Sequence, residues 1–102
     1  MLQVRISKPI YSILTSLTGE KRADVALELA AKDLLRLRLK EVEERIQEFE
    51  SRYHMKFADF KQAWAAGQIA NQYSYEVERD YWEWEAAIGD AQKYQQMLDE
   101  WL

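Results

Sequence analysis

The carboxylates of the stretch EVERDYWEWE, residues 76–85, have the types and spacing that could do chemistry in this sequence. Glu76, Asp80 and Glu83 follow one another at i, i+4 and i+7, which places them on one face of a helix. Carboxylates that converge in a pocket can catalyse glycoside hydrolysis or bind a hard cation. Nothing in the sequence indicates convergence. Beside Trp82 and Trp84, these groups are more typical of the solvated side of an amphipathic helix.

Other signals for catalysis or cofactor binding are weak. His54 is the one histidine, and the chain has no cysteine, so neither a metal site nor a nucleophile–base pair is indicated. The three glycines stand far apart and form no phosphate-binding loop. We therefore expect a protein that is not an enzyme and that has no cofactor and no metal, with His54 in a solvated turn.

Length and composition indicate one helical unit. The chain has 102 residues, of which 48% are hydrophobic and 13% aromatic, and only three glycines and one proline interrupt it. No apolar run approaches the roughly 18 residues of a membrane span, and the N-terminus lacks the apolar region of a signal peptide. We expect a cytoplasmic protein without a membrane partner.

The charges divide the chain into two regions. Residues 1–40 hold eight basic and four acidic side chains, whereas residues 41–102 hold six basic and fourteen acidic ones. Such a split suggests two surfaces with different partners, although charges also solvate helix faces without any further role. We expect a basic region at 1–40 and an acidic, aromatic region at 41–102.

Apolar spacing predicts four helices. The first covers residues 9–18 and ends before Gly19, the second runs from about residue 22 to residue 52, a short third ends near Gly67, and the last begins after Ser74. The second and last helices carry seams with alternating spacings of four and three, typical of coiled-coil-like packing. The seams comprise Leu35, Leu39, Val42, Ile46, Phe49 and Tyr53, and Val77, Tyr81, Trp84, Ile88, Ala91, Gln95, Leu98 and Leu102.

The N-terminal stretch LQVRISKP, residues 2–9, alternates apolar and polar side chains and predicts a short β-strand. One strand needs a partner for its backbone groups. The order of strand, helix, glycine turn and long helix over residues 2–35 resembles the ribbon-helix-helix fold of small DNA-binding repressors. The resemblance implies a mainly α protein whose short strand pairs with its copy in a homodimer, followed by a long helix and C-terminal helices.

The same resemblance implies a site for operator DNA. In the family the two-stranded ribbon enters the major groove. Gln3, Arg5 and Ser7 would face the bases, where Arg suits guanine and Gln suits adenine. Lys21 and Arg22, in the turn before the second helix, would contact phosphate, helped by the N–H groups of the helix start.

A second resemblance concerns the C-terminal part. The segments RLKEVEERIQEFESRYHMKFADFKQAW and YSYEVERDYWEWEA look like a group of small prokaryotic proteins of the toxin–antitoxin kind. The matching positions are Met55, Phe57, Phe60, Trp64, Tyr75, Glu76, Val77, Glu78, Asp80, Tyr81, Glu83, Trp84 and Glu85. This resemblance implies an antitoxin that represses its own operator and covers a small toxin with its C-terminal helices. The predicted partner-binding residues are Tyr75, Glu76, Glu78, Asp80, Tyr81, Trp82, Glu83 and Glu85.

Three functions therefore stand as alternatives. The first is an antitoxin-like autorepressor that binds operator DNA as a dimer and neutralises a toxin. The second is a helical, dimeric protein-interaction module without DNA binding, held through the two seams. The third is a small enzyme that uses a carboxylate together with His54.

Overall fold

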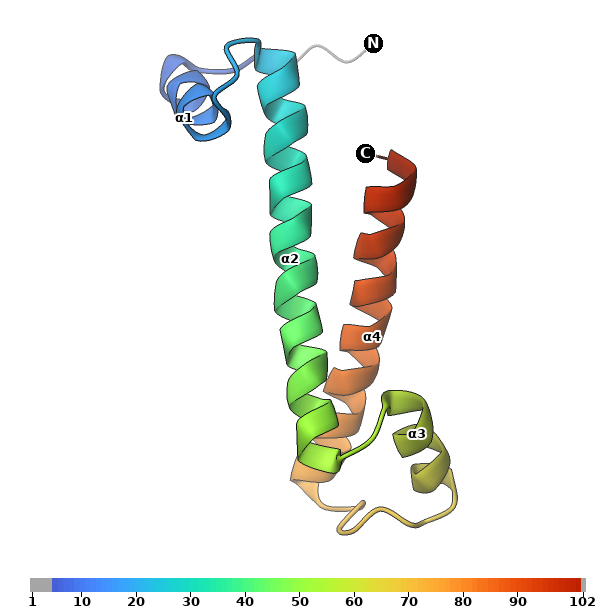
Figure 1. Cartoon of the computed structure of the whole chain (residues 1–102). Coiled ribbons are helices and arrows are strands. Elements are labelled where there is room, and N and C mark those ends of the chain that lie inside the picture. Colours follow the sequence, from blue (N-terminus) through green and yellow to red (C-terminus); the bar gives the residue numbers. More distant parts are fainter. Residues whose placement is uncertain (1–4, 102) are drawn as a thin grey trace.

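The computed structural model describes residues 5–101, and this part of the chain forms four helices (Figure 1). They are α1 (Lys8–Thr18), α2 (Ala23–Tyr53), α3 (Phe57–Ala65) and α4 (Tyr75–Trp101). The long helices α2 and α4 form an antiparallel hairpin, α3 lies at its connected end, and α1 lies beside the start of α2 (Figure 1). The prediction of a mainly α protein is confirmed.

The predicted β-strand ribbon is wrong. Among residues 5–101 no strand is present, and the described part of the LQVRISKP stretch leads directly into α1. Residues 2–4 of that stretch lie outside the described residues. Alternation of apolar and polar side chains describes a strand only when a neighbouring strand satisfies its backbone groups, and no other part of the described chain offers one. The ribbon-helix-helix arrangement, which depends on such a ribbon, is therefore not present among residues 5–101.

The helix ends follow local chemistry. Pro9 lies in the first turn of α1, where its missing N–H costs nothing. Gly19 ends the helix in the left-handed conformation, with φ 71°, and donates its N–H to the carbonyl of Thr15 at 2.9 Å. His54 ends α2 with φ 58°, and Ser74 caps α4, its Oγ accepting the N–H of Val77 at 3.3 Å.

An aromatic cluster forms the core at the connected end of the hairpin. Phe49 of α2, Phe60 of α3 and Trp84 of α4 are each 0% exposed. The Phe49 and Trp84 rings are stacked with centroids 5.5 Å apart, and the centroids of Phe60 and Trp84 are 5.0 Å apart. Each of the three helices contributes one ring, so the cluster joins α3 to the hairpin. Half-buried residues packed against it are Ile46, Tyr53, Met55, Phe57, Trp64, Ile69, Val77, Tyr81 and Ile88.

The two predicted seams pack against each other within one chain. Ile46 and Tyr53 from α2 meet Val77 and Ile88 from α4 around the aromatic cluster. At this end of the molecule the seams therefore hold α2 and α4 of one chain together.

The molecule is elongated. Its radius of gyration is 19.4 Å and its extents are 57 × 24 × 19 Å, whereas a compact chain of this length is expected to have a radius of gyration of about 13 Å. α1 and the first turns of α2 lie at the opposite end of the molecule from α3 (Figure 1). Only one end of the hairpin therefore has three helices around a common core.

Candidate partner-binding surface

An ion-pair network fixes how α4 lies on α2. The carboxylate of Asp80 on α4 is almost completely buried, with 4% of the residue exposed. Its Oδ2 accepts a hydrogen bond from Arg52 Nη1 at 2.8 Å and another from the Tyr53 hydroxyl at 2.6 Å. Both donors lie at the end of α2. Because a buried carboxylate is costly without partners, this network holds the start of α4 in one rotational setting.

The network shifts the pKa values of its members. Burial raises the pKa of Tyr53 to about 12, and the hydrogen bond to Asp80 contributes in the same direction. Burial alone would raise the pKa of Asp80, but the hydrogen bonds from Tyr53 and Arg52 outweigh it and lower this pKa below its ordinary value. The hydrogen bond to Asp80 raises the pKa of Arg52. The carboxylate is therefore ionised and the phenol neutral at pH 7, as a structural network requires.

A second ion pair turns another carboxylate of α4 toward α2. Arg45 Nη2 hydrogen-bonds Glu83, and Nη1 of the same arginine bonds Glu48 at 3.3 Å. The guanidinium also lies over the ring of Phe49, 4.8 Å from its centroid. Glu83 thus helps to hold the hairpin together, since its charge is shared with a residue of α2.

The opposite side of α4 presents aromatic side chains to solvent. Tyr75 and Trp82, at positions i and i+7, are 74% and 73% exposed. Between them lie Glu78 and Arg79, and these residues, with Glu83, line a shallow hollow of about 300 Å³. The guanidinium of Arg79 is 5.5 Å from the centroid of Tyr75. We call Tyr75, Glu78, Arg79 and Trp82 the outer face of α4.

The predicted partner-binding residues therefore divide into two sets. Five of them are exposed: Tyr75, Glu76, Glu78, Trp82 and Glu85. Three are engaged within the hairpin or half-buried: Asp80, Tyr81 and Glu83. Tyr81 packs against Trp64, with 4.8 Å between ring centroids. The spacing i, i+4, i+7 correctly placed Asp80 and Glu83 on a common side, but that side faces α2.

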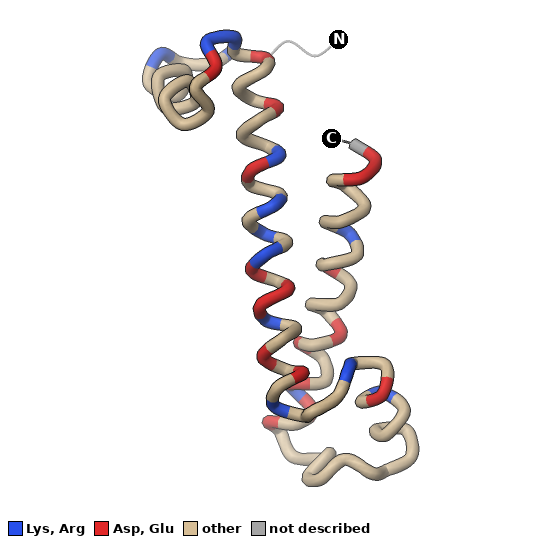
Figure 2. Tube along the Cα trace, viewed as in Figure 1, with Lys and Arg blue, Asp and Glu red and all other residues tan. Residues whose placement is uncertain are grey.

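The predicted DNA-binding residues lie at the other end of the molecule. Arg5, Ser7, Lys21 and Arg22 are exposed, and Gln3 lies outside the described residues. Arg22 pairs with Asp24 at 2.9 Å. Its backbone N–H is bound by Glu20 Oε1 at 3.1 Å. Figure 2 shows basic residues around the α1–α2 turn, far from α3. In the absence of a strand among residues 5–7, nothing in the structure presents Arg5 or Ser7 as a base reader.

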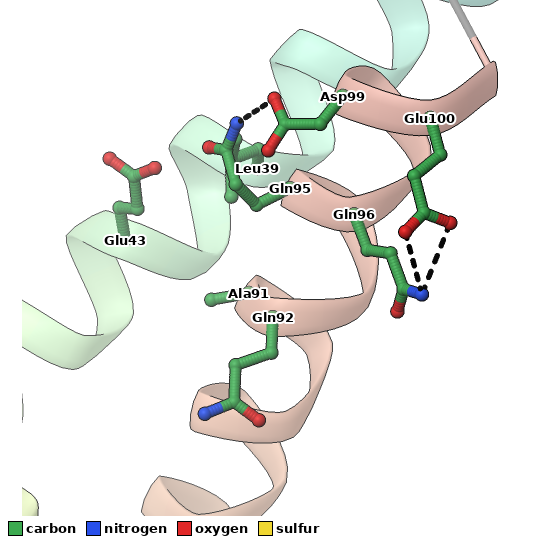
Figure 3. Close-up of a pocket in the computed structure, with 8 residues that line it drawn as sticks. All are labelled: Leu39, Glu43, Ala91, Gln92, Gln95, Gln96, Asp99 and Glu100. Atoms are coloured by element: carbon green, nitrogen blue, oxygen red, sulfur yellow. Dashed lines mark hydrogen bonds between the residues drawn. The ribbon is translucent and has the colours of Figure 1, made fainter.

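A groove opens where α2 and α4 diverge. Its volume is about 510 Å³, and Figure 3 shows Leu39 and Ala91 at its floor with amides and carboxylates around them. Gln95 and Gln96 hydrogen-bond Asp99 and Glu100 one turn further along α4, at 3.0 and 3.2 Å. These polar groups bind one another along α4 and do not converge on the groove.

Other possible sites are limited. Among the described residues, no three acidic, histidine or cysteine side chains are placed to share a metal ion. His54 is exposed in a left-handed turn, and its neighbours in the chain are Tyr53 and Met55. No described helix combines the length and the apolar character that a membrane crossing needs.

Sequence reasoning missed one surface altogether. Large apolar side chains of α1 and of the first half of α2 are exposed, and they comprise Ile10, Tyr11, Ile13, Leu17, Leu27, Leu29, Leu34 and Leu37. Residues 25–35 form a nearly continuous apolar run, a pattern typical of a buried helix. The apolar run predicts that these side chains are buried, but it does not show whether the chain itself or another molecule buries them.

No family model, curated protein or solved structure matches this chain.

Proposed function

We propose that this chain is a helical protein-interaction module, which binds a partner protein with a basic, arginine-bearing surface through the outer face of α4. The observation that carries the proposal is the exposure of Trp82, 73%, only two residues from a tryptophan that is wholly buried. Exposed tryptophan and tyrosine side chains that lie side by side are the usual anchors of protein interfaces.

Charge supports a partner with a basic surface. The 76–85 stretch holds five carboxylates and one arginine. Glu76, Glu78 and Glu85 remain exposed beside the aromatic rings, and none of these three is in an ion pair shorter than 4 Å among the described residues. An arginine of the partner can stack on Trp82 and also bind a neighbouring carboxylate, which a lysine does less well. Attraction between opposite charges would also speed association.

The network of Asp80, Arg52 and Tyr53 supports the same proposal. A binding helix is effective when its side chains are already held in the bound orientation, because less conformational entropy is lost on binding. The buried carboxylate fixes the rotation of α4, and Trp82 then points away from α2. The module is thus rigid at the point where its anchor protrudes.

The resemblance to antitoxins suggests that this partner is a small toxin. A small toxin that acts on RNA would need a basic groove, and an acidic aromatic helix would suit that groove. This form of the proposal concerns toxin neutralisation alone. Operator binding is not included, because the strand ribbon on which it depended is not present among residues 5–7.

Site-specific photo-crosslinking tests the proposal. A photoreactive phenylalanine analogue replaces Trp82 in the full chain, inside cells that express it, and mass spectrometry identifies what is captured. Gln62, an exposed residue of α3, takes the same analogue as the matched control. We expect one protein captured at 82 and not at 62, with its crosslinked peptide rich in arginine and lysine.

A charge variant then examines the binding chemistry. Glu78→Gln with Glu85→Gln removes two exposed carboxylates without touching the network of Asp80. We expect the affinity for the captured protein to fall at least about tenfold at low salt, and the loss to shrink as salt screens the charges. Equal capture at positions 62 and 82, or affinity that is indifferent to the charge variant, would overturn the proposal.

A further inference from the structure

The chain exposes more surface than a folded monomer of its size should. Its accessible surface is 7996 Å², whereas a compact monomer of 12.2 kDa is expected to expose about 6,000 Å². An excess of about 2,000 Å² is roughly what one subunit contributes to an obligate dimer. Elongation accounts for part of such an excess in any rod-shaped protein. The position of the exposed apolar side chains shows which part of the surface lacks a cover.

The apolar surface is concentrated on α1 and the first half of α2. None of the residues of α1 is buried, although Ile10, Ile13 and Leu17 form one side of this helix and are 50–78% exposed. On α2, Leu34 and Leu37 are 54% and 50% exposed. A helix of 11 residues is marginal in water by itself, so it needs more apolar contact than α2 alone provides.

We propose that a second copy of this chain covers this surface, with the two α2 helices antiparallel and α1 of each copy lying over Leu34 and Leu37 of the other. Each chain carries both halves of such a contact. Its α1 has an apolar face, and its α2 has exposed leucines on which the α1 of another copy can pack. A two-fold symmetric dimer forms this contact twice, because α1 of each chain then covers the exposed leucines of the other.

Charge selects the antiparallel orientation. Along this part of α2 the acidic residues Asp24 and Glu28 come first, Lys32 and Asp33 lie in the middle, and the basic residues Arg36, Arg38 and Lys40 follow (Figure 2). In an antiparallel pair the acidic start of each helix lies beside the basic stretch of the other. In a parallel pair like charges would lie side by side, which is unfavourable.

The position of α1 agrees with this geometry. α1 lies beside the first turns of α2, where Ala26 is fully buried and the Tyr11 hydroxyl bonds the carbonyl of Lys21 at 2.5 Å (Figure 1). When residues 24–28 of one α2 lie opposite residues 36–40 of the other, α1 is brought level with Leu34 and Leu37 of the second copy. The outer face of α4 lies toward the opposite end of each hairpin, so the dimer presents it twice.

Mass measurement tests whether the dimer exists. Light scattering on the full chain at micromolar concentration should give about twice 12.2 kDa. The variant Leu34→Glu with Leu37→Glu should give one chain, because charges at the centre of the apolar contact remain desolvated in the dimer. Ala58→Glu with Gln47→Glu adds the same two charges at exposed positions outside the contact and should remain a dimer.

The two variants separate dimer loss from unfolding. Leu34 and Leu37 lie far along α2 from Phe49, so the far-ultraviolet circular dichroism of the double variant should keep most of the helical signal. A wild-type mass of one chain overturns the proposal. A dimer that survives Leu34→Glu with Leu37→Glu overturns it as well, since another surface must then hold the copies together.

Spin labels test the orientation. The chain has no cysteine, so Glu44→Cys, at an exposed position of α2, carries a single nitroxide per chain. With the two helices centred near Lys32, antiparallel pairing places the two labels about 36 Å apart along the helix axis. Parallel pairing places them about 10 Å apart across the interface, and that result would overturn the proposed arrangement. These experiments do not affect partner binding by the outer face of α4, because the spin label and both leucines lie on α2.

Discussion

The two ends of the hairpin differ in how far the apolar side chains of α2 are buried. At the connected end, rings from three helices enclose one another and Phe49 is fully buried. At the other end, Leu34 on the same helix is 54% exposed. α2 is continuous through both, so helix formation does not distinguish them. The difference is whether another part of the chain covers the apolar side chains of α2. A continuous helix therefore does not imply that its apolar face is buried.

The largest expected effect comes from emptying the aromatic core. Phe49→Ala should lower the free energy of unfolding by about 3–5 kcal/mol, because the ring of Trp84 and its neighbours cannot collapse fully into the space. Chemical denaturation followed by tryptophan fluorescence measures it. Tyr73→Ala, at a residue that is 81% exposed, is the matched control and should change stability by less than about 0.5 kcal/mol. Similar losses of unfolding free energy for both variants would show that burial of the ring does not determine its contribution to stability.

The next effect comes from the buried carboxylate. Asp80→Ala should cost about 1–3 kcal/mol, since it leaves the Tyr53 hydroxyl without its acceptor while Arg52 remains half-exposed and can turn to water. The folded-state pKa of Asp80 is lowered, so its contribution is present above about pH 4 and is lost as pH falls through the folded pKa. Urea midpoints from pH 7 down to pH 2 should fall less steeply in the variant. Parallel curves for the two proteins would contradict this assignment.

A smaller effect concerns the phenol. Tyr53→Phe should cost about 1 kcal/mol at neutral pH, the ordinary contribution of one hydrogen bond. Folding raises the pKa of Tyr53 to about 12. Its contribution is therefore present below about pH 10 and is lost as pH rises toward 12. Thermal unfolding at several alkaline pH values checks this. The wild-type protein should lose stability over this range more steeply than Tyr53→Phe, and an identical pH dependence would exclude the hydroxyl as the cause.

The smallest effect on stability is expected at Trp82. Trp82→Ala should change the free energy of unfolding by less than about 0.5 kcal/mol, because the indole is exposed and makes no part of the core. Iodide should quench the tryptophan fluorescence of the wild-type protein more than that of Trp82→Ala, because the substitution removes an exposed indole and leaves buried Trp84 in place. A loss comparable with that of Phe49→Ala would show that Trp82 is structural and would remove the anchor from the proposed interface.

The sequence was sufficient for the helices and for most of the core. Spacing placed Phe49 and Trp84 on the seams that meet, and Gly19 at a helix end, because these features depend on local periodicity and backbone conformation. The same local reasoning failed at residues 5–7. Alternation there resembles a strand, but a strand exists only through a neighbour that the local sequence does not contain.

The candidate site was predicted in part for a similar reason. Trp82 was expected to bind a partner, and it lies off the seam of the last helix and is 73% exposed. Asp80 and Glu83 were expected to face a partner, yet Arg52 and Arg45, about 28 and 38 residues earlier in the chain, bind them. Ion pairs between helices depend on how the helices rotate against each other, and helical periodicity alone does not set that rotation.

The unbroken length of α2 has a mechanical consequence. The helix has 31 residues and is therefore about 46 Å long, with no proline or glycine at which to bend. The aromatic cluster holds one end of this helix, and α1 lies beside the other end (Figure 1). From Phe49 to Ala23 the helix spans about 39 Å, so a tilt of about 5° at the cluster displaces the start of the helix by about 3 Å. A small change in the tilt of α2 at the cluster would thus shift α1 by a few ångströms, because a straight helix transmits the tilt along its whole length.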